Sequence, residues 1–318
     1  MLMRIPAIPL LSLTLAFAQV PPDVQYRHLS TFGSKQGIHP PGFLNAKPLR
    51  GALGNSDHPY GLVFPAAVAA DLRGRVWIAD RGTASVQVFD PAGGSYREIR
   101  KLGESLLQQP AGIAADRQGR IFLSDAATGA VFAFDEQGEF DRTMVKPGSG
   151  TLAAPSAIAL SDDQKTVWVL DPPRGHVVAL NREGEVNSTI ALPPDLADPS
   201  AIAIVDNQVC VLGQRLHRAA IFSPAGLPRG ELQWDGIRFP TAFAFDPARR
   251  LYFVANPRWM IVQVFDQEGR NLGAFGQLGE GVDQVERIES LYVDPSGKVY
   301  VVDSHHGKVL VFEPIAAP

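Results

Sequence analysis

A pattern that recurs six times at a spacing of about 45 residues constrains this chain more than any other feature. Its clearest copy is PAAVAADLRGRVWIADRGTASVQVFD, residues 65–90, which reads as three short β-rich runs separated by turns. Self-similarity at such a period is typical of solenoids and propellers. The copies begin at Pro65, Pro110, Pro155, Pro199, Pro240 and Arg287.

The second and third runs keep a constant register in all six copies. Ten positions separate their ends, as from Asp80 to Asp90 and from Asp303 to Glu313. One position of the second run is aromatic in five of the six copies, as expected where neighbouring sheets pack face to face. The residues at this position are Trp77, Phe122, Trp168, Cys210, Phe253 and Tyr300. Five copies then continue with a fourth run.

The sixth copy lacks a fourth run, and the segment YRHLSTF at residues 26–32 can supply it. A ring closed in this way leaves no unpaired strand edge. We therefore predict an all-β fold, a six-bladed β-propeller of four-stranded antiparallel blades in which an N-terminal strand completes the last blade. The predicted propeller spans residues 25–318, follows a short tail at 19–24, and has a long loop at 33–61 that enters the first blade.

The first 18 residues read as a secretory signal peptide. Arg4 is followed by an apolar run over residues 5–17 and by the small-x-small cleavage pattern Ala16-Phe17-Ala18. Cleavage is favoured over a retained anchor, because the run is shorter than the ~20 residues that span a bilayer. We expect an extracytoplasmic protein without a membrane span. Its one cysteine, Cys210, lies in an alternating apolar run and is expected to be a buried strand residue.

Composition excludes some classes of protein. The net charge is −4, whereas a general nucleic-acid binder needs a basic surface. A hydrophobic fraction of 45% is typical of a folded globular chain. We expect a monomer that does not bind nucleic acid.

The repeat pattern resembles the NHL repeats of six-bladed β-propellers, most clearly at residues 65–135 and 291–312. The resemblance implies the propeller fold and a protein of the exported bacterial type. The Asn-His-Arg triplet that names the family is not kept before the third run, where only His217-Arg218 retains its last two letters. The resemblance therefore implies nothing about those positions.

Basic residues cluster after the second run, on the face where a propeller usually binds ligands. They are Arg81, Arg174, Arg215, Arg258, His305 and His306, and the long loop adds His58 and Tyr60. Converging positive charge concentrates anions, and arginine is well shaped to hold a carboxylate or phosphate. These residues predict a binding or scaffolding module for a protein, a peptide or a small anionic ligand. The alternative is that ordinary surface arginines point in several directions.

A second alternative is a metal-dependent hydrolase or lyase, since lactonases of the gluconolactonase type and the amidating lyases resemble this chain in architecture. The first runs, such as PAAVAAD, direct small apolar groups toward the axis, with Glu289 as the acidic exception. No histidines stand at a recognised zinc-ligand spacing. We therefore expect no metal and no cofactor, and the sequence identifies no catalytic residue. The aspartates that end the second run, Asp80, Asp125, Asp171 and Asp303, are interpreted as turn residues that accept backbone hydrogen bonds.

Overall fold

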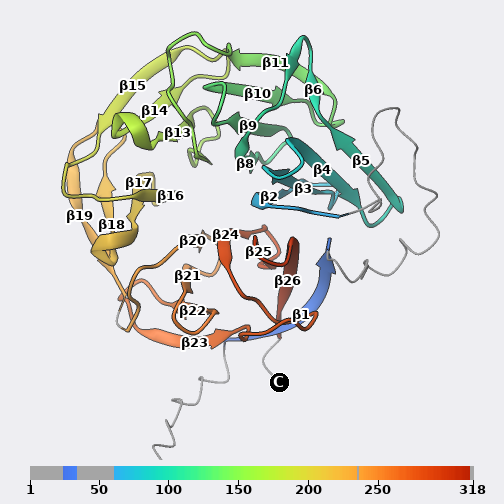
Figure 1. The fold of residues 1–318 in the computed structure, drawn as a ribbon. Helices are drawn as coiled ribbons and strands as arrows, with labels where there is room; N and C mark the ends of the chain where they lie inside the picture. The colour runs from blue at the N-terminus through green and yellow to red at the C-terminus, as the bar shows by residue number, and fades with distance from the viewer. Residues whose placement is uncertain (1–23, 34–60, 235, 316–318) are drawn as a thin grey trace, which may run out of the picture.

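The computed structural model describes residues 24–33, 61–234 and 236–315. In this part of the chain, six four-stranded antiparallel sheets surround a central axis (Figure 1). The first strand of each blade lies innermost and the fourth outermost (Figure 1). The predicted six-bladed β-propeller is therefore confirmed. Among the described residues, no helix is long and apolar enough to cross a membrane.

The first blade consists of β2 (Pro65–Ala70), β3 (Val76–Asp80), β4 (Ser85–Asp90) and β5 (Ser95–Ile99). The second consists of β8 (Pro110–Ala115), β9 (Ile121–Asp125), β10 (Ala130–Phe134) and β11 (Phe140–Val145). The third consists of β12 (Ala157–Leu160), β13 (Val167–Asp171), β14 (His176–Leu180) and β15 (Val186–Ala191). Two 3-10 turns, η2 (Pro172–Arg174) and η3 (Gln214–Leu216), follow the second strands of the third and fourth blades.

The fourth blade consists of β16 (Pro199–Val205), β17 (Gln208–Gly213), β18 (Arg218–Phe222) and β19 (Pro228–Gln233). The fifth consists of β20 (Phe243–Asp246), β21 (Leu251–Asn256), β22 (Ile261–Phe265) and β23 (Asn271–Phe275). The sixth consists of β24 (Ile288–Val293), β25 (Val299–Asp303), β26 (Lys308–Ile315) and β1 (Gln25–Phe32). We call the face that carries the loops between second and third strands the upper face. The face that carries the loops between first and second strands is the lower face.

Some strand ends differ from the sequence pattern, most clearly in the first and fifth blades. The run SYREIRKL ends as a strand at Ile99, and its last two residues form a separate hairpin, β6 (Lys101–Leu102) with β7 (Ser105–Leu106). In the fifth blade the strand begins at Phe243 and not at Pro240. Pro240 has no N–H for a ladder, and Phe239 before it has a φ of 56°.

The aromatic position of the second strand packs between blades, as predicted. Trp77 of β3 is fully buried, and its ring lies 5.1 Å from that of Phe134 in the next blade. Phe253 is buried in the same way between the fifth and sixth blades. Cys210 is buried as predicted, and this burial raises the pKa of its thiol to about 12.

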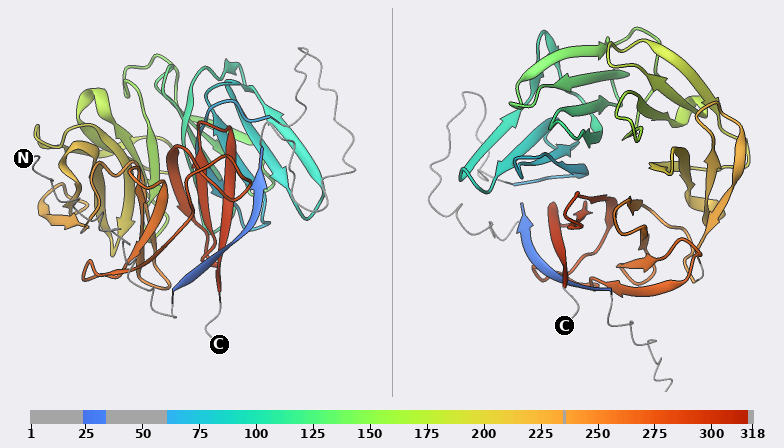
Figure 2. Two further views of the ribbon diagram at one scale, coloured as in Figure 1. Left: turned by 60° about the horizontal axis from the view of Figure 1, so that its bottom comes forward. Right: turned by 180° about the vertical axis from the view of Figure 1, so that it is seen from behind.

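The ring closes through β1, which pairs with β26 in antiparallel register (Figure 2). Tyr26 stacks on Phe275 of the fifth blade at 4.8 Å, and Phe32 lies 5.3 Å from Phe89 of the first blade. β1 of the sixth blade therefore also contacts the fifth and the first blades. This confirms the closure that the missing fourth run predicted.

Acidification is expected to weaken this closure through His28 of β1. Burial lowers the pKa of His28 from 6.5, which outweighs the charge of Asp283. Thr31 Oγ1 donates to the carbonyl of Val282 and accepts from His28 Nε2 at 2.8 Å, so the neutral ring already makes this bond. Below pH 6.5 the unfolded chain therefore binds more protons than the folded one, and stability falls until the lower, folded pKa is passed.

The matched measurement compares the urea midpoint of the wild type with that of His28→Gln between about pH 7.5 and pH 5. We expect the wild type to lose more stability on acidification than the variant. Equal pH slopes would contradict a contribution from His28.

Candidate functional site

The first strands of all six blades enclose an axial channel with a volume of about 700 Å³. Apolar residues of β2, β8, β12, β16 and β20 form much of its wall; many of them are alanines, as predicted, while β20 contributes Phe243 and Phe245. This volume lies in the range of small-molecule sites, about 300–1,000 Å³. Polar groups gather at the two ends of the channel, so the chemistry of the ends decides what it can hold.

Three of the aspartates at the lower end stabilise the fold through pairs with arginine. Asp71 accepts from Arg75 at 2.6 Å and from the indole of Trp77 at 2.9 Å. The other lower pairs are Asp116 with Arg120 at 2.7 Å and Asp246 with Arg249 at 2.9 Å. The carboxylates of these three pairs are buried and paired, which is typical of structural turn residues.

The charges at the upper end are less completely paired. Arg81, in the loop between β3 and β4, has its Nη1 3.4 Å from Oε1 of Glu289. Oε2 of Glu289 is 3.6 Å from Nε of Arg287 and accepts from Ser304 at 3.3 Å. The buried Nε of Arg81 has no hydrogen-bond partner among the described residues. A buried donor without a partner calls for an explanation such as a ligand or a water.

Asp303 organises the neighbouring part of the upper face. This buried carboxylate ends β25 and accepts backbone N–H bonds from Glu286, Arg287, His305 and His306 at 3.1 to 3.3 Å. It also contacts Nδ1 of His306 at 2.8 Å. The bonds tie the connector before β24 to the loop between β25 and β26. Glu286 is thereby held over the two histidines.

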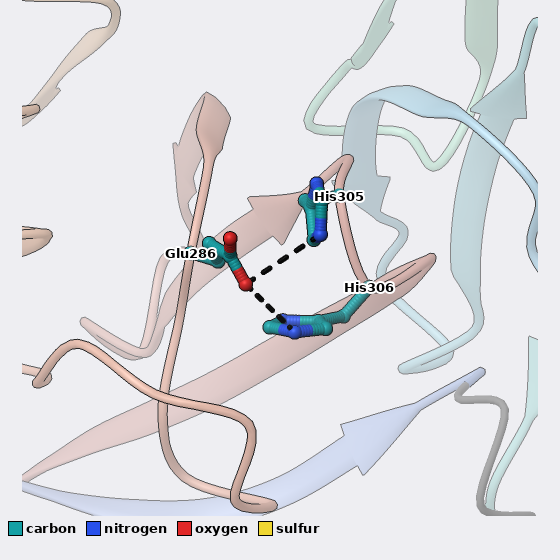
Figure 3. A group of neighbouring side chains, drawn as sticks. All are labelled: Glu286, His305 and His306. Carbon is teal, nitrogen blue, oxygen red and sulfur yellow. Dashed lines mark ion pairs between the residues drawn. The ribbon is translucent and has the colours of Figure 1, made fainter.

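Glu286, His305 and His306 form a group of facing side chains, as Figure 3 shows. Oε2 of Glu286 lies 3.5 Å from Nε2 of His305 and 3.1 Å from Nε2 of His306. Lys308, which pairs with Asp303 across the β25–β26 ladder, is buried beside this group and donates to the carbonyl of Gly281 at 2.7 Å. Burial lowers the pKa of Lys308, while Asp303 and Asp283 act in the opposite direction.

The aspartates that end the second strand in other blades also bond to the connector that precedes their blade. Asp80 accepts from the backbone of Val63 and Phe64, and from Gly82 and Thr83 in its own loop. Asp125 and Asp171 also bind the connector before their blade, through Gln108, Gln109, Ala153 and Ala154. The predicted turn role is confirmed for Asp80, Asp125 and Asp303, each of which accepts backbone N–H bonds from its own loop. Asp171 makes no side-chain bond to the backbone of η2 and anchors the connector alone.

The structure places the predicted rim residues in different surroundings. Arg81 lines the channel, and His305 and His306 face Glu286. Arg174, in η2, donates to the carbonyls of Thr151 and Gly150 at 2.7 and 2.6 Å. His58 and Tyr60 lie outside the described residues.

Arg215 and Arg258 are exposed, and neither is among the described residues that line the channel. Arg215 of η3 pairs with Asp198 at 2.5 Å. The guanidinium of Arg258 lies over the ring of Trp259 at 5.0 Å. Ligand binding by the rim residues stays a prediction, and the geometry brings only part of the set together.

Two residues of the site were not recognised in the sequence, Glu286 and Arg287. Each belongs to the connector before β24, where the repeat pattern is degenerate and lacks its proline. The spacing from Asp303 could have identified them, because this aspartate accepts backbone bonds from the residues 16 and 17 positions before it.

Comparison with known proteins supports the fold. No protein-family model and no curated protein matches the chain. Among solved structures, virginiamycin B lyase from Staphylococcus aureus is similar with a TM-score of 0.60 and 14% identity, over 92% of this chain and 99% of that one. A streptogramin B lyase is similar with a TM-score of 0.59 and 14% identity, over 79% of each chain. A protein of unknown function from Bacteroides thetaiotaomicron reaches 0.67 at 13% identity, over 92% of this chain and 76% of that one. At these identities the likeness shows a shared fold.

Proposed function

We propose that this protein binds a small organic anion in its axial channel, with the acidic group of the ligand at Arg81 and Arg287. The observation that carries the proposal is the guanidinium of Arg81 at the upper end of the channel, whose side chain is 29% exposed and whose Nε has no hydrogen-bond partner among the described residues. The nearest carboxylate, Glu289, contacts Arg81 only at 3.4 Å, longer than a normal charge-assisted bond of about 2.7–2.9 Å. A ligand carboxylate could therefore complete the guanidinium's hydrogen bonds.

The rest of the channel suits the body of such a ligand. Its wall is apolar in the middle, and the aspartates Asp71, Asp116 and Asp246 at the lower end are buried and paired. Small-molecule sites commonly combine an apolar wall with a few placed polar groups. The proposal narrows the predicted anion-binding face to the channel mouth.

A paired set of probes tests this function. Purified protein is heated with phenylpropionate, naphthoate and hexanoate, and separately with the neutral amide of each acid. We expect at least one carboxylate to raise Tm while its amide does not, because ligand binding stabilises the folded state. Arg81→Gln should abolish the increase, and Arg174→Gln, in the corresponding loop of the third blade, should keep it. Equal increases with acid and amide, or in Arg81→Gln, would contradict the proposal.

A lyase or hydrolase is the second candidate function. The observation that favours it is the Glu286, His305 and His306 group beside the mouth, since imidazole and carboxylate groups are the usual carriers of protons in catalysis. Three similar structures are described as lyases, and one of these, a catalytically inactive virginiamycin B lyase from Staphylococcus aureus, is described together with quinupristin. Incubation with quinupristin, followed by mass spectrometry, gives a direct assay. Unchanged quinupristin would leave no support for this particular substrate.

Three further statements are proposals that rest on sequence pattern alone. They are the assignment to the NHL type, export through residues 1–18, and docking of a protein or peptide on the upper face.

A further inference from the structure

We propose that Glu286, His305 and His306 form a zinc site on the upper face. Two imidazole nitrogens and one carboxylate oxygen are a ligand set that Zn²⁺ takes in proteins, whereas Mg²⁺ and Ca²⁺ prefer oxygen ligands. The three ligand atoms lie within 4.8 Å of one another. Three protein ligands leave one tetrahedral position for water or a ligand.

The distances fit the ion. Bonds of about 2.0–2.2 Å place neighbouring ligands of a tetrahedral zinc about 3.3–3.5 Å apart. Oε2 of Glu286 is 3.1 Å from Nε2 of His306 and 3.5 Å from Nε2 of His305. The His305 side chain is 57% exposed, so rotation of its ring can adjust the remaining distance between the two imidazoles.

Asp303 prepares His306 as a ligand. Oδ2 of this buried carboxylate lies 2.8 Å from Nδ1 of His306, so Nδ1 carries the proton and donates it. Nε2 is the nitrogen that remains for a metal ion, and it faces the carboxylate of Glu286 at 3.1 Å. A carboxylate behind a metal-binding histidine is a common arrangement that fixes the tautomer and the ring.

The backbone holds the two histidines on the same side of their loop. The N–H groups of His305 and His306 both donate to Oδ1 of Asp303, at 3.1 and 3.3 Å. Gly307 follows with a φ of 61°, and a Cβ at this position would collide with the backbone oxygen of Leu62. Neighbouring residues of an extended strand would point to opposite faces. The turn therefore brings together two ligands that a strand would separate.

The test measures zinc binding by the full chain without a histidine tag. The metal-free protein is titrated with Zn²⁺ against a fluorescent zinc indicator, in the presence and absence of millimolar Mg²⁺. We expect one zinc per chain, unaffected by Mg²⁺, and a rise in Tm with zinc. Glu286→Gln and His306→Ala should weaken binding by more than the ~10–100-fold typical of losing a supporting residue.

His217→Ala is the matched control. His217 lies in the corresponding loop of the fourth blade, where its Nδ1 accepts from the backbone of Phe239 at 2.9 Å, and it should bind zinc as the wild type does. His305→Ala provides a second variant, because a side chain this exposed can be removed without unfolding the blade. The proposal fails if the wild type takes up no zinc at micromolar concentration, or if His305→Ala keeps full affinity. It also fails if His217→Ala loses as much affinity as the ligand variants. No carboxylate probe is present, so the result is independent of ligand binding at Arg81.

Discussion

Replacement of Trp77 by alanine is expected to lower the free energy of unfolding by about 3–5 kcal/mol, the cost typical of deleting a buried aromatic ring. The indole is fully buried, and it lies 5.1 Å from the ring of Phe134 across the boundary between the first and second blades. The guanidinium groups of Arg75 and Arg97 lie 5.5 and 5.9 Å from the same ring. A cavity at this place therefore affects the packing of both blades and the contacts of the two arginines with the ring.

The indole also takes part in a hydrogen-bond network. Its Nε1 donates to Oδ2 of Asp71 at 2.9 Å, and the same oxygen accepts from Arg75 at 2.6 Å. The truncation leaves this buried carboxylate with one donor fewer, which adds to the cost of the cavity. We therefore expect Trp77→Phe, which keeps most of the ring but not its N–H, to lose less stability than Trp77→Ala.

Trp259→Ala is the control, because this indole is 46% exposed and contacts Arg258 on the upper face. Surface substitutions usually change stability by about 0.5 kcal/mol or less. Denaturation in urea, followed by far-UV circular dichroism, compares the variants without depending on tryptophan fluorescence. Equal midpoints for Trp77→Ala and Trp259→Ala would contradict the packing described for Trp77.

The repeat made the fold predictable from the sequence. Each copy repeats the register of its strands, so weak signals in one blade are supported by the others. Even the position of Trp77 could be assigned to a boundary between sheets before the structure was known. The strand ends were harder, because local backbone conformation at residues such as Phe239 interrupts the pattern.

The candidate site was only partly predictable. His305 and His306 stood out in the sequence, but their partner Glu286 lies in a connector that carries no repeat signal. Contact between them depends on Asp303, which bonds both segments. The turn role of this aspartate could be inferred from its own loop, whereas its bond to the connector is a tertiary contact. The rim arginines lie in different surroundings for a similar reason, since a loop position does not fix where a long side chain finds its partner.

Removal of β1 is expected to open the ring and to convert the monomer we expect into aggregates. A chain that begins at Gly33 lacks Tyr26 and Phe32, whose rings pack on the fifth and first blades. Phe32 is buried and Tyr26 is partly buried, so the loss of Phe32 alone costs about 3–5 kcal/mol and that of Tyr26 adds to it. This is a large part of the stability of a typical domain, about 5–15 kcal/mol. The control is a chain that begins at Asp23 and keeps β1 intact.

The unpaired β26 supplies the reason for aggregation. Residues Lys308 to Phe312 of this strand are buried in the closed ring, and its outer edge bonds to β1. Without β1 this apolar strand offers free backbone groups to another chain. Size-exclusion chromatography with light scattering should therefore show a monomer for the control and large species for the shortened chain. A monomeric shortened chain with an unchanged urea midpoint would contradict this role of β1.

A synthetic peptide of residues 24–33 separates loss of the edge from general misfolding. If the shortened chain fails because its edge is open, the peptide can add to β26 as an extra strand and restore the monomer, since an extended peptide binds a free sheet edge through main-chain hydrogen bonds. A peptide with Tyr26 and Phe32 both replaced by alanine can make the same ladder but loses the rings that contact the neighbouring blades. Rescue by the native peptide alone would therefore show that closure depends on packing across three blades, and rescue by both would assign it to the β1–β26 ladder.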